Sequence, residues 1–329
     1  MTTDKQNKLA LVFALMAYSI FGFSFLFSKI ALGVVSPFVL LAVRFSMAFL
    51  TLNLLMAFGV FRIRLKGKNV KRLLLLGIFQ PILYFIFENF GMRLSTASFA
   101  GIMIAMVPMV SLILSGLILK EKVRLTQGLF VLLSIVGVFF TTAGQLDVDF
   151  QWGGFFLLMG AVFSAGLFNI FNRKLAREFG SFERTYVMFA LGFVVFTGVA
   201  LVENRGVPLM TVLEPMKDPV FWGSVTFLAV ASSVGAFLML NYAATHLSVV
   251  QATIFSNITT IVSILAGVLI LKEDFGVFQL LGSVIIIISA YGVNRKPRNQ
   301  RDGSFDYALG VEPALAVAEV VVVEGEEIV

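Results

Sequence analysis

Long apolar stretches recur along the whole chain and restrict its fold more than any other feature. A helix needs about 20 consecutive apolar residues to cross roughly 30 Å of hydrocarbon at about 1.5 Å per residue. The sequence contains ten such stretches with short connections between them. Their approximate ranges are 9–31, 37–60, 73–92, 96–119, 125–143, 152–171, 186–202, 220–245, 249–271 and 275–293. We therefore predict an all-α integral membrane protein with ten transmembrane helices.

Composition agrees with this prediction and excludes several classes of site. Hydrophobic residues make up 59% of the 329 residues and charged residues 13%, too little polar surface for a soluble domain. There is no Cys and only one His, so disulfide frameworks, Cys/His zinc sites and iron–sulfur clusters are excluded. We expect no metal and no cofactor. The net charge of +6 does not indicate a nucleic-acid partner, because the basic residues are scattered between apolar stretches.

The distribution of Lys and Arg predicts the orientation of the chain. Of 25 such residues, 19 lie in the N-terminal head, in the connections after even-numbered stretches and in the tail. Five lie in the remaining connections, and Arg44 lies within a span. Because cytoplasmic loops carry the excess of positive charge, we predict that both termini are cytoplasmic. We expect the protein to reside in the plasma (inner) membrane.

An internal repeat divides the chain into two similar halves. Residues 106–129 align with residues 258–281 at a constant offset, and nine of the 24 positions are identical, including Lys120, Glu121 and Gln127. Five spans are an odd number, so the second copy must cross the membrane in the opposite sense. The predicted segments are a cytoplasmic N-terminus (1–8), a first five-helix repeat (9–143), an inverted second repeat (144–294) and a disordered, acidic cytoplasmic tail (295–329). Inverted repeats are typical of secondary transporters that work by alternating access.

Three sequence features resemble a known family. The fourth and ninth stretches end in Ser-Gly-Leu-Ile-Leu-Lys-Glu (115–121) and Ala-Gly-Val-Leu-Ile-Leu-Lys-Glu (266–273). Arg44 lies in the second stretch within Ser-Pro-Phe-Val-Leu-Leu-Ala-Val-Arg-Phe, and Pro108 precedes the first motif. Together they resemble the drug/metabolite transporter (DMT) superfamily, EamA type. One departure is that Thr260 replaces Pro108 in the second half, which leaves the symmetry of the helix bend in doubt.

The resemblance has implications for both fold and function. It implies ten helices around a central cavity that is lined mainly by helices 1, 3, 4, 6, 8 and 9, with helices 5 and 10 at the periphery. It also implies transport of amino acids or other small metabolites, usually out of the cell.

Two charged residues lie within predicted spans, where an uncompensated charge is costly. Arg44 and Glu88 have similar depth below the outer ends of the second and third stretches. In one hypothesis Glu88 carries a proton or binds a substrate ammonium, and Arg44 modulates Glu88 or binds a carboxylate. In the other, the two residues form a structural ion pair, or Arg44 extends to the lipid headgroups.

Polar residues at helical spacing indicate further substrate contacts. Gln80, Tyr84 and Glu88 are four apart and form one ridge. The ninth stretch carries a polar face that includes Asn257, which lines either a wet cavity or a helix contact. Pro81 and Pro108 are expected to bend their helices. The predicted substrate-binding residues are Tyr18, Ser24, Gln80, Tyr84, Glu88, Asn169, Ser233, Thr253, Asn257 and Thr260.

These features favour a secondary transporter that moves a small polar metabolite, such as an amino acid, across the cytoplasmic membrane. We expect a small-molecule substrate and the lipid bilayer as partners, coupling to protons through Glu88 as one hypothesis, and a monomer or homodimer. An exporter of drugs or organic cations with the same fold is an alternative. A channel would not need the repeat. An intramembrane Ser-His hydrolase would need His246 beside a serine, and no G-x-S-x-G motif is present.

Overall fold

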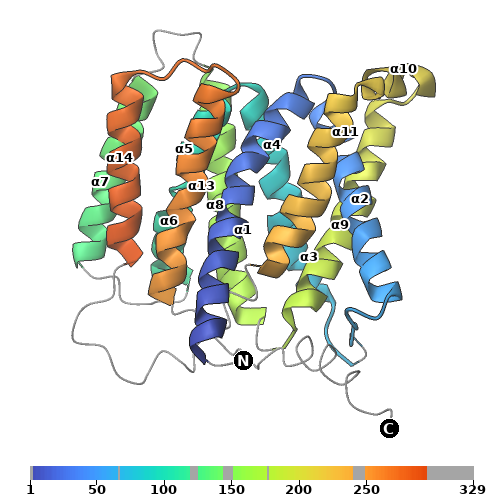
Figure 1. The fold of residues 1–329 in the computed structure, drawn as a ribbon, viewed down its shortest axis with the longest axis horizontal. Coiled ribbons are helices and arrows are strands. Elements are labelled where there is room, and N and C mark those ends of the chain that lie inside the picture. The colour runs from blue at the N-terminus through green and yellow to red at the C-terminus, as the bar shows by residue number, and fades with distance from the viewer. Residues whose placement is uncertain are drawn as a thin grey trace.

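The protein folds into a bundle of helices that run roughly parallel or antiparallel to one another (Figure 1). The coordinates are a computed structural model, which describes residues 3–65, 67–118, 125–143, 151–175, 178–239 and 249–294. Every regular element among these residues is helical. The predicted acidic tail and His246 lie outside the described residues.

Eight helical segments are formed by those residues of the first half that the structure describes. They are α1 (Thr3–Leu32), α2 (Pro37–Ala57), α3 (Lys71–Gly77), the π-helix η1 (Ile78–Leu83), α4 (Tyr84–Arg93), α5 (Ala97–Ile104), α6 (Val107–Ile118) and α7 (Leu125–Ala143). Segments α3, η1 and α4 follow one another without a gap, so they form one long broken helix.

The described residues of the second half form eight further segments. They are α8 (Trp152–Leu175), α9 (Ser181–Glu203), α10 (Leu209–Leu213), the 3-10 helix η2 (Glu214–Lys217), α11 (Pro219–Thr226), the π-helix η3 (Phe227–Ala236), α13 (Val249–Leu269) and α14 (Val277–Asn294). The short helices α10 and η2 lie in a connection that the hydropathy pattern left without structure.

Eight helices of the described chain are long and apolar enough to cross a membrane, and two shorter apolar stretches, Asn257–Leu269 and Val277–Gly292, follow them. The eight are Leu9–Leu32, Pro37–Ala57, Lys71–Arg93, Ala97–Ile118, Leu125–Ala143, Trp152–Asn172, Phe182–Glu203 and Pro219–Met239. The protein is thus an all-helical membrane protein, as predicted.

Proline explains two of the helix breaks. At Gln80 the backbone leaves helical geometry (φ −144°, ψ 119°), and Pro81 follows it inside η1. A turn at Ala105 and Met106 separates α5 from α6 just before Pro108. Proline lacks the N–H that an interior helix position needs, so both bends are as expected. Helix α13 runs unbroken past Thr260, so the two halves differ at this point.

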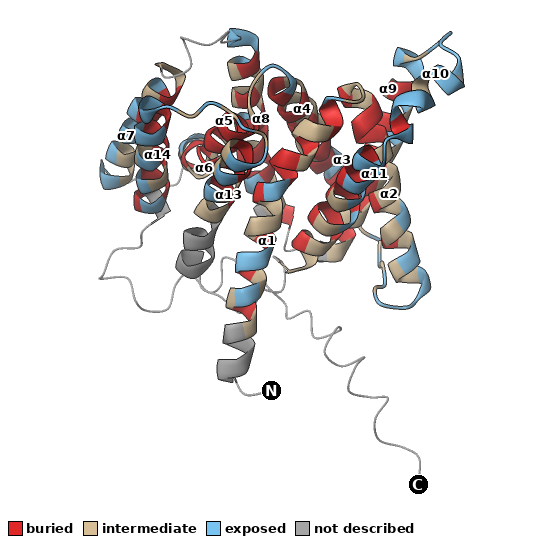
Figure 2. Cartoon of the chain, turned by 45° about the horizontal axis from the view of Figure 1, so that its top comes forward, coloured by how far each residue is buried: buried red, intermediate tan, exposed pale blue. Residues whose placement is uncertain are grey.

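Burial follows the arrangement of the bundle. Helices α1 and α13, α2 and α9, α4 and α8, and α7 and α14 pack against each other. Buried residues line the facing sides of these helices, whereas exposed residues lie on the outer sides (Figure 2). Many of the exposed residues are large and apolar, such as Leu125 and Phe139 in α7. Lipid tails solvate such side chains, so this distribution is that of a protein embedded in a bilayer.

Candidate functional site

Arg44 of α2 is a buried cation, and no other Lys or Arg among the residues with described side chains is as buried. Arg44 is 4% exposed, and its guanidinium carbon lies 4.5 Å from the ring centre of Phe85. Its Nε donates a hydrogen bond to Ser233 Oγ of η3 at 3.2 Å. The charge is therefore stabilised by an aromatic face and a hydroxyl that belong to two other helices. Phe45 packs edge-on against Phe85 at 5.2 Å and holds this ring in place.

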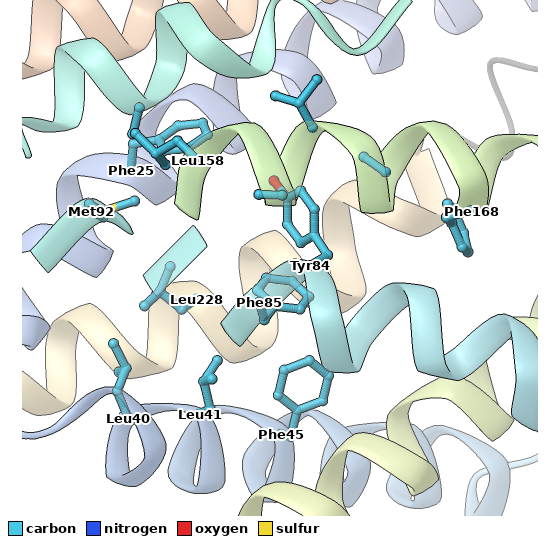
Figure 3. Packing of buried hydrophobic residues seen from close by; sticks show 14 of the residues in the cluster. Phe25, Leu40, Leu41, Phe45, Tyr84, Phe85, Met92, Leu158, Phe168 and Leu228 are labelled. Carbon is cyan, nitrogen blue, oxygen red and sulfur yellow. The ribbon is translucent and has the colours of Figure 1, made fainter. Parts of the chain in front are cut away.

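Glu88 of α4 is the matching buried anion. It is 5% exposed, and Tyr84 donates a hydrogen bond to its Oε1 at 3.0 Å from one helical turn away. Asn89 Nδ2 lies 3.5 Å from Oε2 and donates to the Phe85 carbonyl at 2.8 Å. The Asn89 Oδ1 atom is buried without a hydrogen-bond partner. Figure 3 shows Tyr84 and Phe85 between α8 and the α2 side chains Leu41 and Phe45.

Arg44 and Glu88 attract each other electrostatically without forming an ion pair. Both lie in the described chain, and their charged atoms are farther apart than the 4.0 Å of an ion pair. Each charge is instead held by neutral groups. An arrangement of two buried, opposite charges that do not neutralise each other can bind a small molecule carrying both signs of charge.

The helix break at η1 packs against α8. The Phe79 carbonyl beside the break accepts the Tyr84 N–H within the helix and a second hydrogen bond from the Ser164 hydroxyl of α8 at 2.7 Å. Gln80 lies at this break and is half-buried. In the second half, the irregular helix η3 carries Ser233, which is 2% exposed. Thus η3 contributes a side chain that contacts Arg44.

Other predicted residues take part in helix packing. Thr260 donates to the Gly101 carbonyl of α5 at 3.2 Å. The neighbouring Thr259 donates to the Tyr18 carbonyl of α1 at 3.0 Å, so the backbone of Tyr18 is part of a helix contact. Ser24 donates to the Phe21 carbonyl of its own helix at 2.6 Å. The polar face of α13 is therefore a packing surface at these positions.

Of the remaining predicted residues, the structure describes the side chains of Asn169 and Asn257. Asn169 is exposed and donates to Ser111 Oγ at 3.2 Å, which places its side chain on a helix surface. Asn257 is half-buried in α13. The Thr253 side chain lies outside the described residues. Sequence reasoning missed Phe85 and Asn89, although their position next to Tyr84 and Glu88 is a signal that could have identified them.

An apolar hollow of about 580 Å³ lies between α6 and the first part of α7. Leu112 and Leu132 are among its lining residues, and all of the lining residues are apolar or glycine. It contains none of the predicted substrate-binding residues. Its chemistry suits lipid chains and not a polar metabolite.

Comparisons with known proteins place the chain in a family. The profile of the EamA-like transporter family matches twice, over residues 8–143 and 152–295. The chain is 33% identical over 303 residues to the uncharacterized transporter YcxC of Bacillus subtilis (strain 168), covering 91% of this chain and 97% of that relative. It is 24% identical over 286 residues to an uncharacterized transporter of Archaeoglobus fulgidus, covering 85% and 97% respectively.

Structural similarity agrees with the sequence match. A solved crystal structure superposes with a TM-score of 0.60 at 16% identity, covering 86% of this chain and 95% of the other, which shows a shared fold. The chain belongs to the EamA-like transporter family and contains two EamA-type halves.

Proposed function

We propose that the protein is a secondary transporter that exports a small polar metabolite by alternating access. Membership in a transporter family establishes that it is a membrane transporter and not an enzyme. The finer proposal includes ten spans in two inverted repeats around a central cavity, with both termini in the cytoplasm. It also places the protein in the plasma membrane, which the bacterial relative supports.

The packing of the helices supports the inverted repeat. The contact of α1 with α13 has its counterpart in the contact of α8 with α6. The contact of α1 with η3 has its counterpart in that of α8 with η1. In the repeat, α2 is the counterpart of α9, and α7 is the counterpart of α14. Each of these helices packs against its own counterpart. If the halves adopt different conformations, exchanging these conformations moves the opening of a shared cavity from one side to the other.

The observation that carries the proposal is the pair of buried, opposite charges on α2 and α4. Arg44 binds Ser233 of the other half, so a ligand that contacts Arg44 acts on both halves. A carboxylate matches the guanidinium, and an ammonium matches Glu88. Amino acids carry both groups and are the first class to test. Organic cations would need Glu88 alone.

Counterflow in proteoliposomes tests this function. Liposomes preloaded with unlabelled amino acids, sugars, nucleosides or organic cations should accumulate the labelled form of one class with saturable kinetics. Arg44→Gln and Glu88→Gln should each reduce this uptake at least about tenfold, since a charge-assisted hydrogen bond is worth about 1.5–3 kcal/mol. Arg205→Gln, a change at an exposed residue, is the control. Unsaturable flux would indicate a channel, and saturable exchange unaffected by both buried-charge variants would overturn the site.

A further inference from the structure

The turn between α4 and α5 is held by a carboxylate from the opposite half of the chain. Glu273, just beyond α13, accepts hydrogen bonds from the backbone N–H of Ala97 at 2.6 Å and of Ser98 at 2.9 Å. The Ser98 hydroxyl donates to the same carboxylate at 2.6 Å. These N–H groups belong to the first turn of α5, where the helix leaves its donors unpaired and its dipole favours negative charge.

A lysine from a third helix holds the other side of this turn. Lys29, near the end of α1, donates from Nζ to the Met92 carbonyl at 2.8 Å and to the Ser95 carbonyl. The Met92 carbonyl lies in the last turn of α4, where the helix dipole favours positive charge, and Ser95 follows just after this helix. Lys29 and Glu273 also attract each other electrostatically. Each charge is thus placed at the helix end that matches its sign.

The backbone around Glu273 is shaped for this contact. Lys272 has a positive φ of 59°, and the N–H of Glu273 donates to the Gly267 carbonyl at 3.1 Å, so the chain folds back over the end of α13. A Cβ atom at Gly267 would come within 2.2 Å of both the Glu273 carboxylate and Ser98 Oγ. Glycine at this position lets the carboxylate reach α5.

The repeat provides a counterpart that is arranged differently. Lys29 aligns with Lys174 of α8, and Glu273 aligns with Glu121. Lys29 is half-buried and bonded to two carbonyls, whereas Lys174 is exposed and lies 5.8 Å from the ring centre of Phe171. Glu121 lies outside the described residues. The two halves therefore differ at equivalent lysines.

We propose that Lys29 and Glu273 form a clasp that keeps the α4–α5 end of the bundle closed in this conformation. This end lies opposite the N-terminus (Figure 1), which is the outer side in the proposed orientation. The clasp joins α1, the α4–α5 turn and the α13–α14 turn. In the outward-open state of the proposed transport cycle, on which this inference rests, the clasp is released and Lys29 and Glu273 become hydrated. The clasp thus influences the equilibrium between the closed and the outward-open state. It consists of other residues than the Arg44 and Glu88 region.

The absence of cysteine makes a direct test possible, because one introduced thiol is the only reactive one. Ser28, next to Lys29, is 2% exposed, so Ser28→Cys is a near-isosteric reporter of opening at this end. Intact cells are treated with a membrane-impermeant maleimide, and the labelling rate is followed. Adding Glu273→Gln or Lys29→Gln should accelerate labelling at least about tenfold, since charge-assisted bonds are lost. Glu214→Gln, at an exposed residue near the same end, should leave the rate unchanged.

Two further measurements separate the possible failures. Counterflow by the Cys reporter tests the proposed transport function and needs no clasp variant. Labelling needs no substrate, so it tests the clasp even if the substrate is wrong. If both clasp variants fold, as judged by a single peak in size-exclusion chromatography, and label as slowly as the parent, the clasp is refuted. Lower thermal stability with an unchanged labelling rate would also overturn it, because that result describes a static helix cap.

Discussion

At the scale of single residues, the main feature is the stabilisation of two buried charges, Arg44 and Glu88, inside a membrane bundle. An unpaired buried charge costs several kcal/mol, and removing one partner of a buried network leaves the other unsatisfied. Here Tyr84 and Asn89 surround Glu88, while Phe85 and Ser233 surround Arg44. Because neither charge depends on the other for a hydrogen bond, the ligand site that we propose has no ion pair to break.

Glu88→Gln tests whether Glu88 carries a proton. The glutamine keeps the hydrogen bond to Tyr84 but cannot titrate, so we expect transport to lose its pH dependence. The measurement is the counterflow rate from pH 5 to 8 in proteoliposomes. Tyr84→Phe is the companion variant, which removes one hydrogen bond and keeps the carboxylate, so its pH dependence should persist. A glutamine variant with the parent's rate and pH profile would assign Glu88 a structural role.

The sequence predicted part of this region. Charges within spans are identifiable from one sequence, and Gln80, Tyr84 and Glu88 share a spacing of four. The bond between Arg44 and Ser233 joins residues far apart in sequence, so no spacing rule could predict it. Asn169 was assigned to the site by its mid-span position alone, and that assignment stays a prediction; its side chain donates a hydrogen bond to Ser111 of α6.

At the scale of elements, the broken helix from α3 to α4 receives an additional hydrogen bond from a neighbouring helix. Ser164 of α8 donates to Phe79, so Ser164→Ala should lower the free energy of unfolding by about 1 kcal/mol. The measurement is denaturant titration in mixed micelles. Ser134→Ala is the control, because Ser134 is 1% exposed and donates to the Val131 carbonyl of its own helix. An equal effect of both changes would refute a special role for Ser164.

Helices α7 and α14 approach each other through glycines. A Cβ at Gly282 would come within 2.5 Å of the Gly137 carbonyl and 2.6 Å of the Thr141 nitrogen. Because these are backbone atoms, Gly282→Ala should destabilise the protein by about 1–3 kcal/mol in the same titration. Gly128→Ala in α7 is the control, since nothing lies within 4 Å of its Cβ position, and it should be neutral or stabilising. Equal stability of the two variants would contradict the close packing.

Elements were the most predictable level. Hydropathy located the eight helices that are long and apolar enough to span, and Pro81 and Pro108 marked the two breaks, because both signals are local. In the second half, Thr260 stands at the position equivalent to Pro108. Helix α13 is continuous there, so the bend of the first half is not repeated. Helix α9 begins at Ser181, five residues before its predicted start, since Glu183 accepts the Gly180 N–H at 3.0 Å and stabilises a polar first turn.

At the scale of the whole molecule, the pair of α2 and α9 is joined at both ends. Ser36 donates to Glu203 at 2.7 Å at one end. At the other end, Lys68 donates to Glu183 at 2.6 Å and the Arg64 N–H donates to the same carboxylate at 3.2 Å. We expect this pair to act as a fixed support during transport, while the helices around the α4–α5 turn move. The repeat shows the division into halves in the sequence itself. The hydrogen bonds between α2 and α9 join residues of different halves, so they could be identified only in the structure.

The central claim is that the two five-span halves cross the membrane in opposite senses. The repeat places Lys120 and Lys272 at equivalent positions. If the halves are inverted, these two residues lie on opposite sides of the membrane. Each is replaced singly by cysteine in this cysteine-free chain, and intact and permeabilised cells are treated with a membrane-impermeant maleimide. We predict that Lys272→Cys is labelled in intact cells and that Lys120→Cys is labelled only after permeabilisation. Labelling of both cysteines from the same side would contradict the inverted repeat and the transport mechanism built on it.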